Sequence, residues 1–181
     1  FVWSGWEGDV NVRQVLYITE MQNPYTAAGD RVLLSKPEYD WEKRGGTPAI
    51  NEGPQYLKRG NKIFIVYSAS GCWTDDYALG LLSASATADP TNPAAWTKHP
   101  QPVFEKNASA QAFGPGHNSY FTSPDRTENW ILYHANPESG QACGGKRSPR
   151  MQEFYWNSDG FPDFGVPVAL GAALQIPSEE K

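Results

Sequence analysis

The chain of 181 residues contains no long apolar run, no cluster of basic residues and only two cysteines. No window is apolar over the ~18 residues that a membrane-spanning helix requires, so the sequence predicts no membrane span. Fifteen Lys and Arg against 20 Asp and Glu give a net charge of −5 without a basic patch, which argues against nucleic acid as a partner. Neither cysteine has another Cys or a His at metal-ligand spacing, which argues against a structural zinc site.

Aromatic residues and turn formers are abundant instead. Trp, Tyr and Phe make up 13% of the chain, and 15 Pro and 17 Gly interrupt it. This composition is typical of many short strands joined by turns. A surplus of Trp and Tyr also suits a sugar-binding surface, because the apolar face of a sugar ring stacks on an aromatic ring. A β core built from aromatic side chains is the alternative explanation.

Strand-like segments recur with a period of about 65 residues. Helical periodicity is hard to find, whereas runs of β-forming residues are frequent. Val2-Trp3-Ser4, Val66-Tyr67-Ser68 and Leu132-Tyr133-His134 are spaced by 64 and 66 residues. In each repeat a further strand follows (16–21, 77–83 and 151–156), and a last short strand is expected to close the unit (31–35, 101–104 and 165–168). Each complete unit therefore holds four antiparallel strands.

Four antiparallel strands per unit, repeated radially, form the blade of a β-propeller. The predicted blades are approximately residues 1–48, 49–110 and 111–181, and the first lacks its innermost strand. A propeller of about four to eight blades does not close with two complete blades and one incomplete blade. We therefore expect further blades, upstream on the same gene product or on a second chain. A β-sandwich of about eleven strands is the alternative, which the repeat disfavours.

One carboxylate stands where the innermost strands of a propeller would line its channel. Asn51-Glu52-Gly53-Pro54 and Phe113-Gly-Pro-Gly-His117 open two such strands. A Gly beside a carboxylate allows a substrate to approach closely. Partial desolvation on this wall is expected to raise the pKa of Glu52 and keep it protonated, as the general acid of a glycosidase must be. The alternative is an exposed loop glutamate.

Seven motifs, in this order and spacing, resemble glycoside hydrolase family 43. They are Trp3-Ser-Gly-Trp6, Tyr39-Asp-Trp-Glu42, Asn51-Glu-Gly-Pro54, Tyr67-Ser-Ala-Ser-Gly71, Gly114-Pro-Gly-His-Asn-Ser119, Tyr133-His-Ala135 and Arg147-Ser-Pro-Arg-Met-Gln152. The resemblance covers essentially the whole chain. It implies an all-β, five-bladed propeller of which this chain supplies about three blades, the third to the fifth, in the C-terminal portion of a catalytic domain.

The resemblance also implies an activity. The segment is most similar to secreted, extracellular arabinofuranosidases, so we expect an inverting α-L-arabinofuranosidase acting on arabinoxylan or arabinan of the plant cell wall. No cofactor is expected beyond a structural Ca²⁺ in the channel. A β-xylosidase of the same family and a carbohydrate-binding propeller without catalysis are the alternatives. A protein-interaction propeller is a further one, but the sequence reveals no exposed apolar patch for it.

The resemblance assigns roles to individual residues. Glu52 matches the family's general acid, His117 a channel histidine beside the central ion or the substrate, and Arg147 a substrate-contacting arginine, with Arg150 as its competitor. The Asp that serves as general base and the Asp that tunes the acid have no counterpart here. Inversion needs a second carboxyl group about 6.5–9.5 Å from the first. We therefore expect both Asp residues in the N-terminal half of the propeller.

The remaining polar and aromatic residues receive weaker expectations. Trp6 and Trp73 fall on loops at the channel mouth, where each could stack on a sugar or serve as packing. Cys72 and Cys143 lie on corresponding loops of successive blades, so we expect a disulfide that fastens the Arg147 loop to the Trp73 loop.

Four carboxylates and two histidines are expected to have structural roles. Asp75 and Asp76 lie where a loop runs into a strand, and a solvated or turn-capping role is expected for them, as for Glu7 and Asp9. His99 and His134 have no evident partner, so a hydrogen-bonded structural role is expected for both.

Overall fold

The structure is a computed structural model that describes residues 1–180. Its regular elements are strands and three short 3-10 helices. The strands are β1 (Val2–Trp6), β2 (Arg13–Ile18), β3 (Met21–Asn23), β4 (Thr26–Ala27), β5 (Val32–Ser35), β6 (Ala49–Arg59), β7 (Lys62–Ala69), β8 (Ala78–Ser85), β9 (Thr97–Lys98), β10 (Phe113–Thr122), β11 (Asn129–Asn136), β12 (Ser148–Trp156) and β13 (Pro162–Asp163). The 3-10 helices are η1 (Asp40–Lys43), η2 (Pro93–Ala95) and η3 (Ala108–Ala110). The all-β class predicted from the sequence is confirmed.

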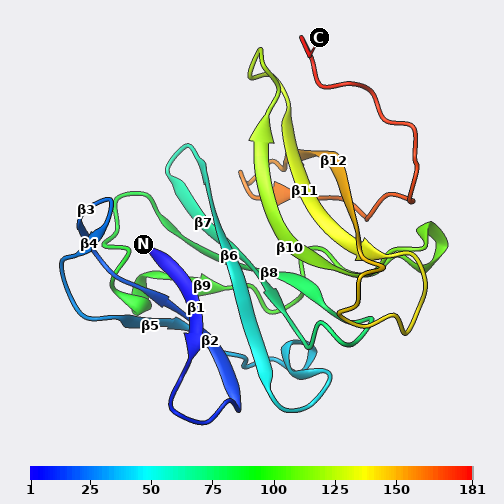
Figure 1. Cartoon of the computed structure of the whole chain (residues 1–181). Helices are drawn as coiled ribbons and strands as arrows, with labels where there is room; N and C mark the ends of the chain where they lie inside the picture. The colour runs from blue at the N-terminus through cyan, green and yellow to red at the C-terminus, as the bar shows by residue number, and fades with distance from the viewer. Residues whose placement is uncertain (181) are drawn as a thin grey trace.

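The strands form two main sheets that curl beside one another (Figure 1). In one, β6, β7, β8 and β9 are neighbours in that order and antiparallel, and β2 carries β1 and β5 on its two sides. A short parallel pairing of β2 with β6, at Arg13–Ala49 and Gln14–Ile50, joins these two parts. The other sheet has the order β10-β11-β12-β13. A small hairpin, β3-β4, stands apart from both.

Three of the predicted strand spans are wrong. The span 101–104 is not a strand, because β9 takes its place and only an isolated bridge joins Phe104 to Leu79. The span 165–168 follows the short strand β13 and forms none itself. Pro102 and Pro167 have no N–H to donate, which prevents a continuous ladder in either span. The span 16–21 is divided, since β2 ends at Ile18 and β3 begins at Met21.

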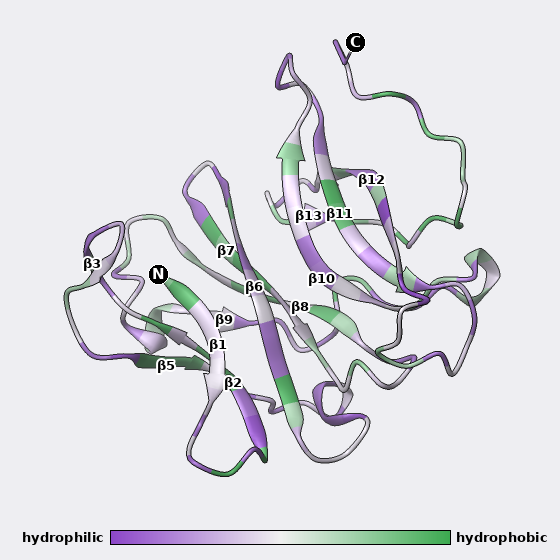
Figure 2. Ribbon diagram, in the orientation of Figure 1, coloured by the Kyte–Doolittle hydropathy of each residue, from purple (hydrophilic) through white to green (hydrophobic). Residues whose placement is uncertain are grey.

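The middle strands are buried on both faces. Along β7 the side chains alternate: Phe64 and Val66 join a core shared with β11 and β12, whereas Ile65 and Tyr67 join a core shared with β2 and β5. Apolar stretches accordingly lie in β7, β8 and β11, and hydrophilic residues gather in the connecting loops (Figure 2). The β6-β9 layer is thus packed between the strands on either side of it.

Bulges re-aim the chain at the two Gly-Pro motifs. The register of β6 against β7 shifts between Glu52 and Gln55, and that of β10 against β11 shifts between Phe113 and Gly116 and again between Gly116 and Ser119. Gly53 and Gly114 both have φ +56°, which glycine adopts without steric cost. Bulges of this kind redirect side chains near strand ends. Glu52 and His117 lie at these two points.

Candidate active site

Glu52 lies in β6 at the bulge, and its side chain is half-buried. The phenol of Tyr77, which immediately precedes β8, donates a hydrogen bond of 2.7 Å to its Oε1 atom. Tyr77 is almost fully buried. Burial, followed by the charge of Glu52 and the hydrogen bond to it, raises the pKa of Tyr77 well above its usual value. The phenol therefore stays protonated and remains a donor to the carboxylate.

His117 lies beside this pair. Its Nδ1 atom is 3.3 Å from the Tyr77 hydroxyl, and its backbone N–H donates to Oγ of Ser68 at 2.8 Å. The residue has φ +53° and an exposed side chain. A Cβ atom added at Gly53 would lie 3.3 Å from the His117 ring. The Glu52, Tyr77 and His117 side chains thus gather around a patch of glycine backbone.

The second Gly of the Gly114-Pro-Gly116 motif also has a steric reason. A Cβ atom added at Gly116 would lie 2.3 Å from Cε1 of Tyr77 and 3.1 Å from Oγ of Ser68. A separation of 2.3 Å is far inside van der Waals contact. Glycine at this position leaves the space that the Tyr77 ring occupies beneath Glu52.

His134 and Arg147 complete the cluster. The His134 ring stacks on Tyr77 with centroids 5.8 Å apart and on His117 at 6.3 Å. Nη1 of Arg147 lies 3.2 Å from Nε2 of His134, and Nη2 donates to the Cys143 carbonyl at 2.9 Å. A guanidinium only donates, so Nε2 accepts and the neutral imidazole carries its proton on Nδ1. Burial, then Arg147 and His117, lowers the pKa of His134 to about 4.

The structure therefore unites Glu52, His117 and Arg147, three residues predicted as site residues, with two that the sequence did not assign to the site. The sequence indicates Tyr77 only as the start of a strand, and it predicts a structural role for His134. The available signal for His134 was its place at the end of the repeated motif Leu132-Tyr133-His134, where the preceding repeat has Ser68. The arrangement offers a carboxyl group with one oxygen already hydrogen-bonded, two imidazoles and a cation, which suits a ligand rich in hydroxyl groups.

Arg150 has a structural role. It is buried, and its guanidinium donates to the carbonyls of Ala110 at 3.3 Å, Gln111 at 2.6 Å and Val168 at 2.7 Å. These contacts fasten the segment after β13 to η3. These contacts favour a structural role for Arg150, and the choice of Arg147 over Arg150 as the substrate contact stays a prediction.

The disulfide between Cys72 and Cys143 is confirmed, with Cα atoms 5.3 Å apart. Trp73, next to Cys72, is 38% exposed and donates from Nε1 to the Gly45 carbonyl at 3.1 Å. Trp6 ends β1 opposite Gln14 and is half-buried. The expectation that Trp6 and Trp73 contact a sugar stays a prediction.

The other carboxylates considered hold loops in place. Asp76 pairs with Arg44 at 3.2 Å and Lys106 at 2.7 Å. Asp75 accepts from Ser139 Oγ and from the Gly140 N–H, the latter at 2.9 Å. Glu7 pairs with Arg13, and Asp9 is exposed. These contacts agree with structural roles.

The structure adds no support for an ion at His117. Within residues 1–180, no group of three or more His, Cys, Asp or Glu side chains is arranged to hold a metal ion. The expected Ca²⁺ therefore stays a prediction. In the same part of the chain, no helix is both long enough and apolar enough to cross a membrane.

Comparisons with known proteins identify the family of the chain. Residues 1–162 match the family described as glycosyl hydrolases family 43. The chain is 44% identical to an extracellular exo-α-(1→5)-L-arabinofuranosidase of Streptomyces avermitilis and 41% identical to α-L-arabinofuranosidase 43 of Humicola insolens, each over 161 residues. Both alignments cover 86% of this chain and 33% of the relative, so the chain spans about a third of these curated relatives.

Solved structures show the same likeness. The α-L-arabinofuranosidase of Lactobacillus brevis superimposes with a TM-score of 0.85 at 37% identity, covering 93% of this chain and 52% of that one. A thermostable family-43 glycoside hydrolase superimposes with a TM-score of 0.80 at 30% identity, covering 99% of this chain and 56% of that one. The chain belongs to glycosyl hydrolases family 43.

Proposed function

We propose that the chain forms part of the catalytic domain of an α-L-arabinofuranosidase in which Glu52 is the general acid. The observation that carries the proposal is the hydrogen bond from Tyr77 to Oε1 of Glu52 in a cluster with His117 and Arg147. The arabinofuranosidase names of relatives that are 38–44% identical support the sugar.

The geometry gives each carboxyl oxygen a separate task. Oε1 of Glu52 accepts from Tyr77, which leaves Oε2 to carry the catalytic proton. In the reaction Oε2 delivers this proton to the glycosidic oxygen as the bond to the anomeric carbon breaks. The attacking water requires a second carboxylate on the opposite side of the sugar. We propose that this base, and the Asp that orients the acid, lie in a part of the protein beyond this chain.

Substrate binding would use the side chains around Glu52. Arg147 and His117 are suited to sugar hydroxyl groups, and Trp73 and Trp6 to stacking on a ring. The proposed substrate is a plant cell-wall arabinan or arabinoxylan from which L-arabinofuranose is released with inversion. β-Xylosidase action and sugar binding without hydrolysis are the competing functions. A general acid at Glu52 is compatible with β-xylosidase action, and the aromatic residues are compatible with either function.

The proposed setting is a five-bladed propeller, with residues 1–48, 49–110 and 111–181 as its third to fifth blades and an N-terminal half that completes the ring. The burial of β7 on both faces supports this arrangement, because a blade within a propeller is covered by both of its neighbours. We also propose that the protein is secreted. The word "extracellular" in the names of two relatives and the disulfide support an oxidising compartment.

Replacing Glu52 by Gln in a complete catalytic domain tests the function. The amide cannot donate the proton, so hydrolysis of arabinan oligosaccharides should fall by about 10²–10⁴-fold. Dinitrophenyl α-L-arabinofuranoside has a leaving group that needs no proton, so the rate of its hydrolysis should fall far less. Glu20→Gln, at an exposed carboxylate, is the matched control and should retain both activities. Equal losses of the two substrates in Glu52→Gln would overturn the acid role, and absence of hydrolysis in the unsubstituted protein would favour sugar binding alone.

A further inference from the structure

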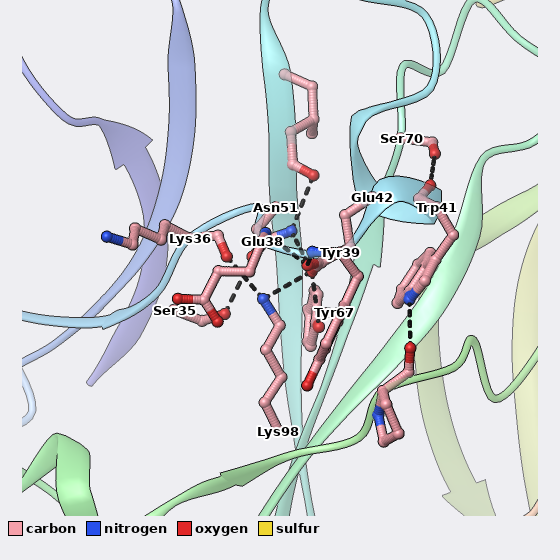
Figure 3. Close-up of polar contacts among 12 residues, drawn as sticks. Ser35, Lys36, Glu38, Tyr39, Trp41, Glu42, Asn51, Tyr67, Ser70 and Lys98 are labelled. Atoms are coloured by element: carbon pink, nitrogen blue, oxygen red, sulfur yellow. Dashed lines mark hydrogen bonds and ion pairs between the residues drawn. The ribbon is translucent and has the colours of Figure 1, made fainter.

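A second carboxylate near the site, that of Glu42, has no part in the mechanism above. It lies on η1, shortly before β6, and its side chain is completely buried. Figure 3 shows it at the centre of a hydrogen-bond network. Its Oε2 accepts from the backbone N–H groups of Glu38 at 2.8 Å and Tyr39 at 2.9 Å, and its Oε1 accepts from Asn51 Nδ2 at 2.9 Å, Tyr67 Oη at 2.9 Å and Lys98 Nζ at 2.8 Å.

The network pairs the Glu42 carboxylate with one cation and with four neutral donors. Burial disfavours a charged carboxylate unless it is paired and hydrogen-bonded, and Lys98 provides the pairing cation. Burial lowers the pKa of Lys98, and Glu42 opposes this change. Burial and then Glu42 raise the pKa of Tyr67, which keeps its phenol a donor. Replacing a buried ion pair by apolar residues often leaves stability unchanged or improved, so stability alone does not explain the network.

The network reaches the candidate acid through Asn51. This residue is completely buried in β6, and its Nδ2 donates to Glu42 while its Oδ1 accepts from Ser35 Oγ at 3.0 Å. Glu52 is the next residue, and the bulge at Gly53 follows at once. Asn51 is therefore the last side chain held from both sides before the backbone turns. A shift of Asn51 is passed directly to the backbone that aims Glu52.

The same helix, η1, also supports the loop between β7 and β8. The carbonyl of Glu42 accepts from the Ser70 N–H at 3.1 Å, and the carbonyl of Arg44 accepts from the Gly71 N–H at 2.9 Å. Cys72 follows, and its disulfide leads to Cys143, whose carbonyl holds Arg147. The helix η1 is thus attached both to the strand that carries Glu52 and to the loop that leads to Arg147.

We infer that Glu42 is a positioning residue for the Glu52 carboxyl group, acting through Asn51. This inference rests on the proposed role of Glu52 as general acid. A general acid must hold its proton within hydrogen-bond reach of the departing oxygen, and a displacement of about 1 Å can lower the rate by about 10²-fold. The buried pair of Glu42 and Lys98 fixes the end of β6 in one orientation, which an apolar pair of the same volume does not do.

The decisive variant is the double substitution Glu42→Gln with Lys98→Met, in a complete catalytic domain. It removes both charges together and nearly preserves volume, so the fold should be retained. The side-chain amide of Gln has one acceptor oxygen, so it can accept from the donors at the Oε1 position or from those at the Oε2 position of Glu42, but not from both. This change weakens the contact that holds Asn51. We expect kcat for arabinan oligosaccharides to fall by about 10–100-fold. The kcat for dinitrophenyl arabinoside and the KM values for both substrates should change by no more than about threefold.

Two further variants isolate the route. Asn51→Ala leaves the ion pair intact and should reproduce the same difference between the two substrates, even if the double variant does not fold. Trp41→Phe alters the same helix. It removes the indole hydrogen bond to the Pro100 carbonyl and part of the ring, but leaves Glu42 and its partners in place, so its ratio of the two activities should match that of the unsubstituted protein.

The outcomes separate the inference from the function on which it rests. If Glu52→Gln shows the dependence on the leaving group but neither the double variant nor Asn51→Ala does, Glu42 is structural and the inference is overturned. If all of these variants lose activity on both substrates equally, the acid role of Glu52 is overturned, and the inference that rests on it is overturned as well. If Trp41→Phe shows the same dependence as Asn51→Ala, any loosening of η1 suffices and the specific role of Glu42 is overturned.

Discussion

The phenol of Tyr77 donates a hydrogen bond of 2.7 Å to Oε1 of Glu52, although Glu52 lies in β6, Tyr77 lies just before β8, and the two residues are 25 positions apart. Tyr77 is buried and its ring stacks on His134, so the direction of this donor is fixed by packing. One carboxyl oxygen is thereby engaged before any substrate arrives. In the proposed mechanism, the proton of Glu52 and the leaving group therefore meet at the other oxygen.

Replacing Tyr77 by Phe should impair proton delivery. The ring still fits beside Gly116, but the carboxyl group loses the contact that holds its rotamer. We expect kcat for arabinan oligosaccharides in a complete catalytic domain to fall by about tenfold or more, with a smaller loss on dinitrophenyl arabinoside. Tyr133→Phe is the matched control, because Tyr133 is another buried tyrosine that donates to a side chain, Gln152, within the core. It should reduce stability and leave the ratio of activities unchanged; a reversed pattern would contradict the role of Tyr77.

The two neighbouring arginines should respond differently to substitution. Arg147→Ala removes a half-buried cation at the site, so KM should rise by about tenfold or more while the urea midpoint stays nearly constant. Arg150→Met leaves three carbonyls without their donor and should lower the free energy of unfolding by about 2–4 kcal/mol, with KM little changed. Steady-state kinetics and urea unfolding of both variants check this. The same effect in both would show that the distinction drawn here is wrong.

Removing the disulfide should destabilise the domain. Cys72 and Cys143 are 71 positions apart. In the chain-entropy account, a cross-link over such a distance lowers the entropy of the unfolded chain and stabilises the folded state by about 4 kcal/mol. The double substitution Cys72→Ser with Cys143→Ser should lower the free energy of unfolding, measured by urea, by a similar amount. It should also raise KM, because the disulfide no longer holds the loop that carries Arg147. Adding a reductant should reproduce the change in the unsubstituted protein and have no effect on the double variant. An unchanged midpoint under both conditions would refute the stabilising role.

His134 should make stability depend on pH in a defined window. Its pKa is about 4 in the folded protein against 6.5 ordinarily, so between these values the unfolded chain binds more protons than the folded one. Stability contributed here is therefore complete above about pH 6.5 and is lost as the pH falls to about 4. Urea midpoints at pH 6.5 and 4.5 should differ less in His134→Asn than in the unsubstituted protein. His99→Gln, at an exposed imidazole, should keep the full difference, and parallel behaviour of the two variants would refute the assignment.

Local patterns in the sequence were sufficient for the strands that carry the site. The repeated motifs Val2-Trp3-Ser4, Val66-Tyr67-Ser68 and Leu132-Tyr133-His134 predicted β1, β7 and β11, and the Gly-Pro motifs located the openings of β6 and β10. The disulfide was also predictable, because the repeat places Cys72 and Cys143 on equivalent loops. Strand-closing segments were predicted less well, since a single proline such as Pro102 decides whether a short ladder continues.

Contacts between distant segments could not be predicted in the same way. Tyr77 reads in the sequence as an ordinary strand residue, and its place below Glu52 depends on the absence of a side chain at Gly116, 39 positions later. The role of Glu42 is equally hidden, because three of its five donors come from β6, β7 and β9 and converge on it only after folding. Such residues are specified by packing in three dimensions, for which neither spacing nor composition gives a signal.

The glycine that follows the proposed acid also bears on how such an enzyme can diversify. Any residue larger than glycine at position 53 would need a rare backbone conformation and would press on the imidazole of His117. Substitution of this glycine is thus closed off as a means of reshaping the surface beside Glu52. Changes in sugar preference would arise more readily on loops, such as those that carry Trp73 and Arg147, because loops tolerate substitution and insertion.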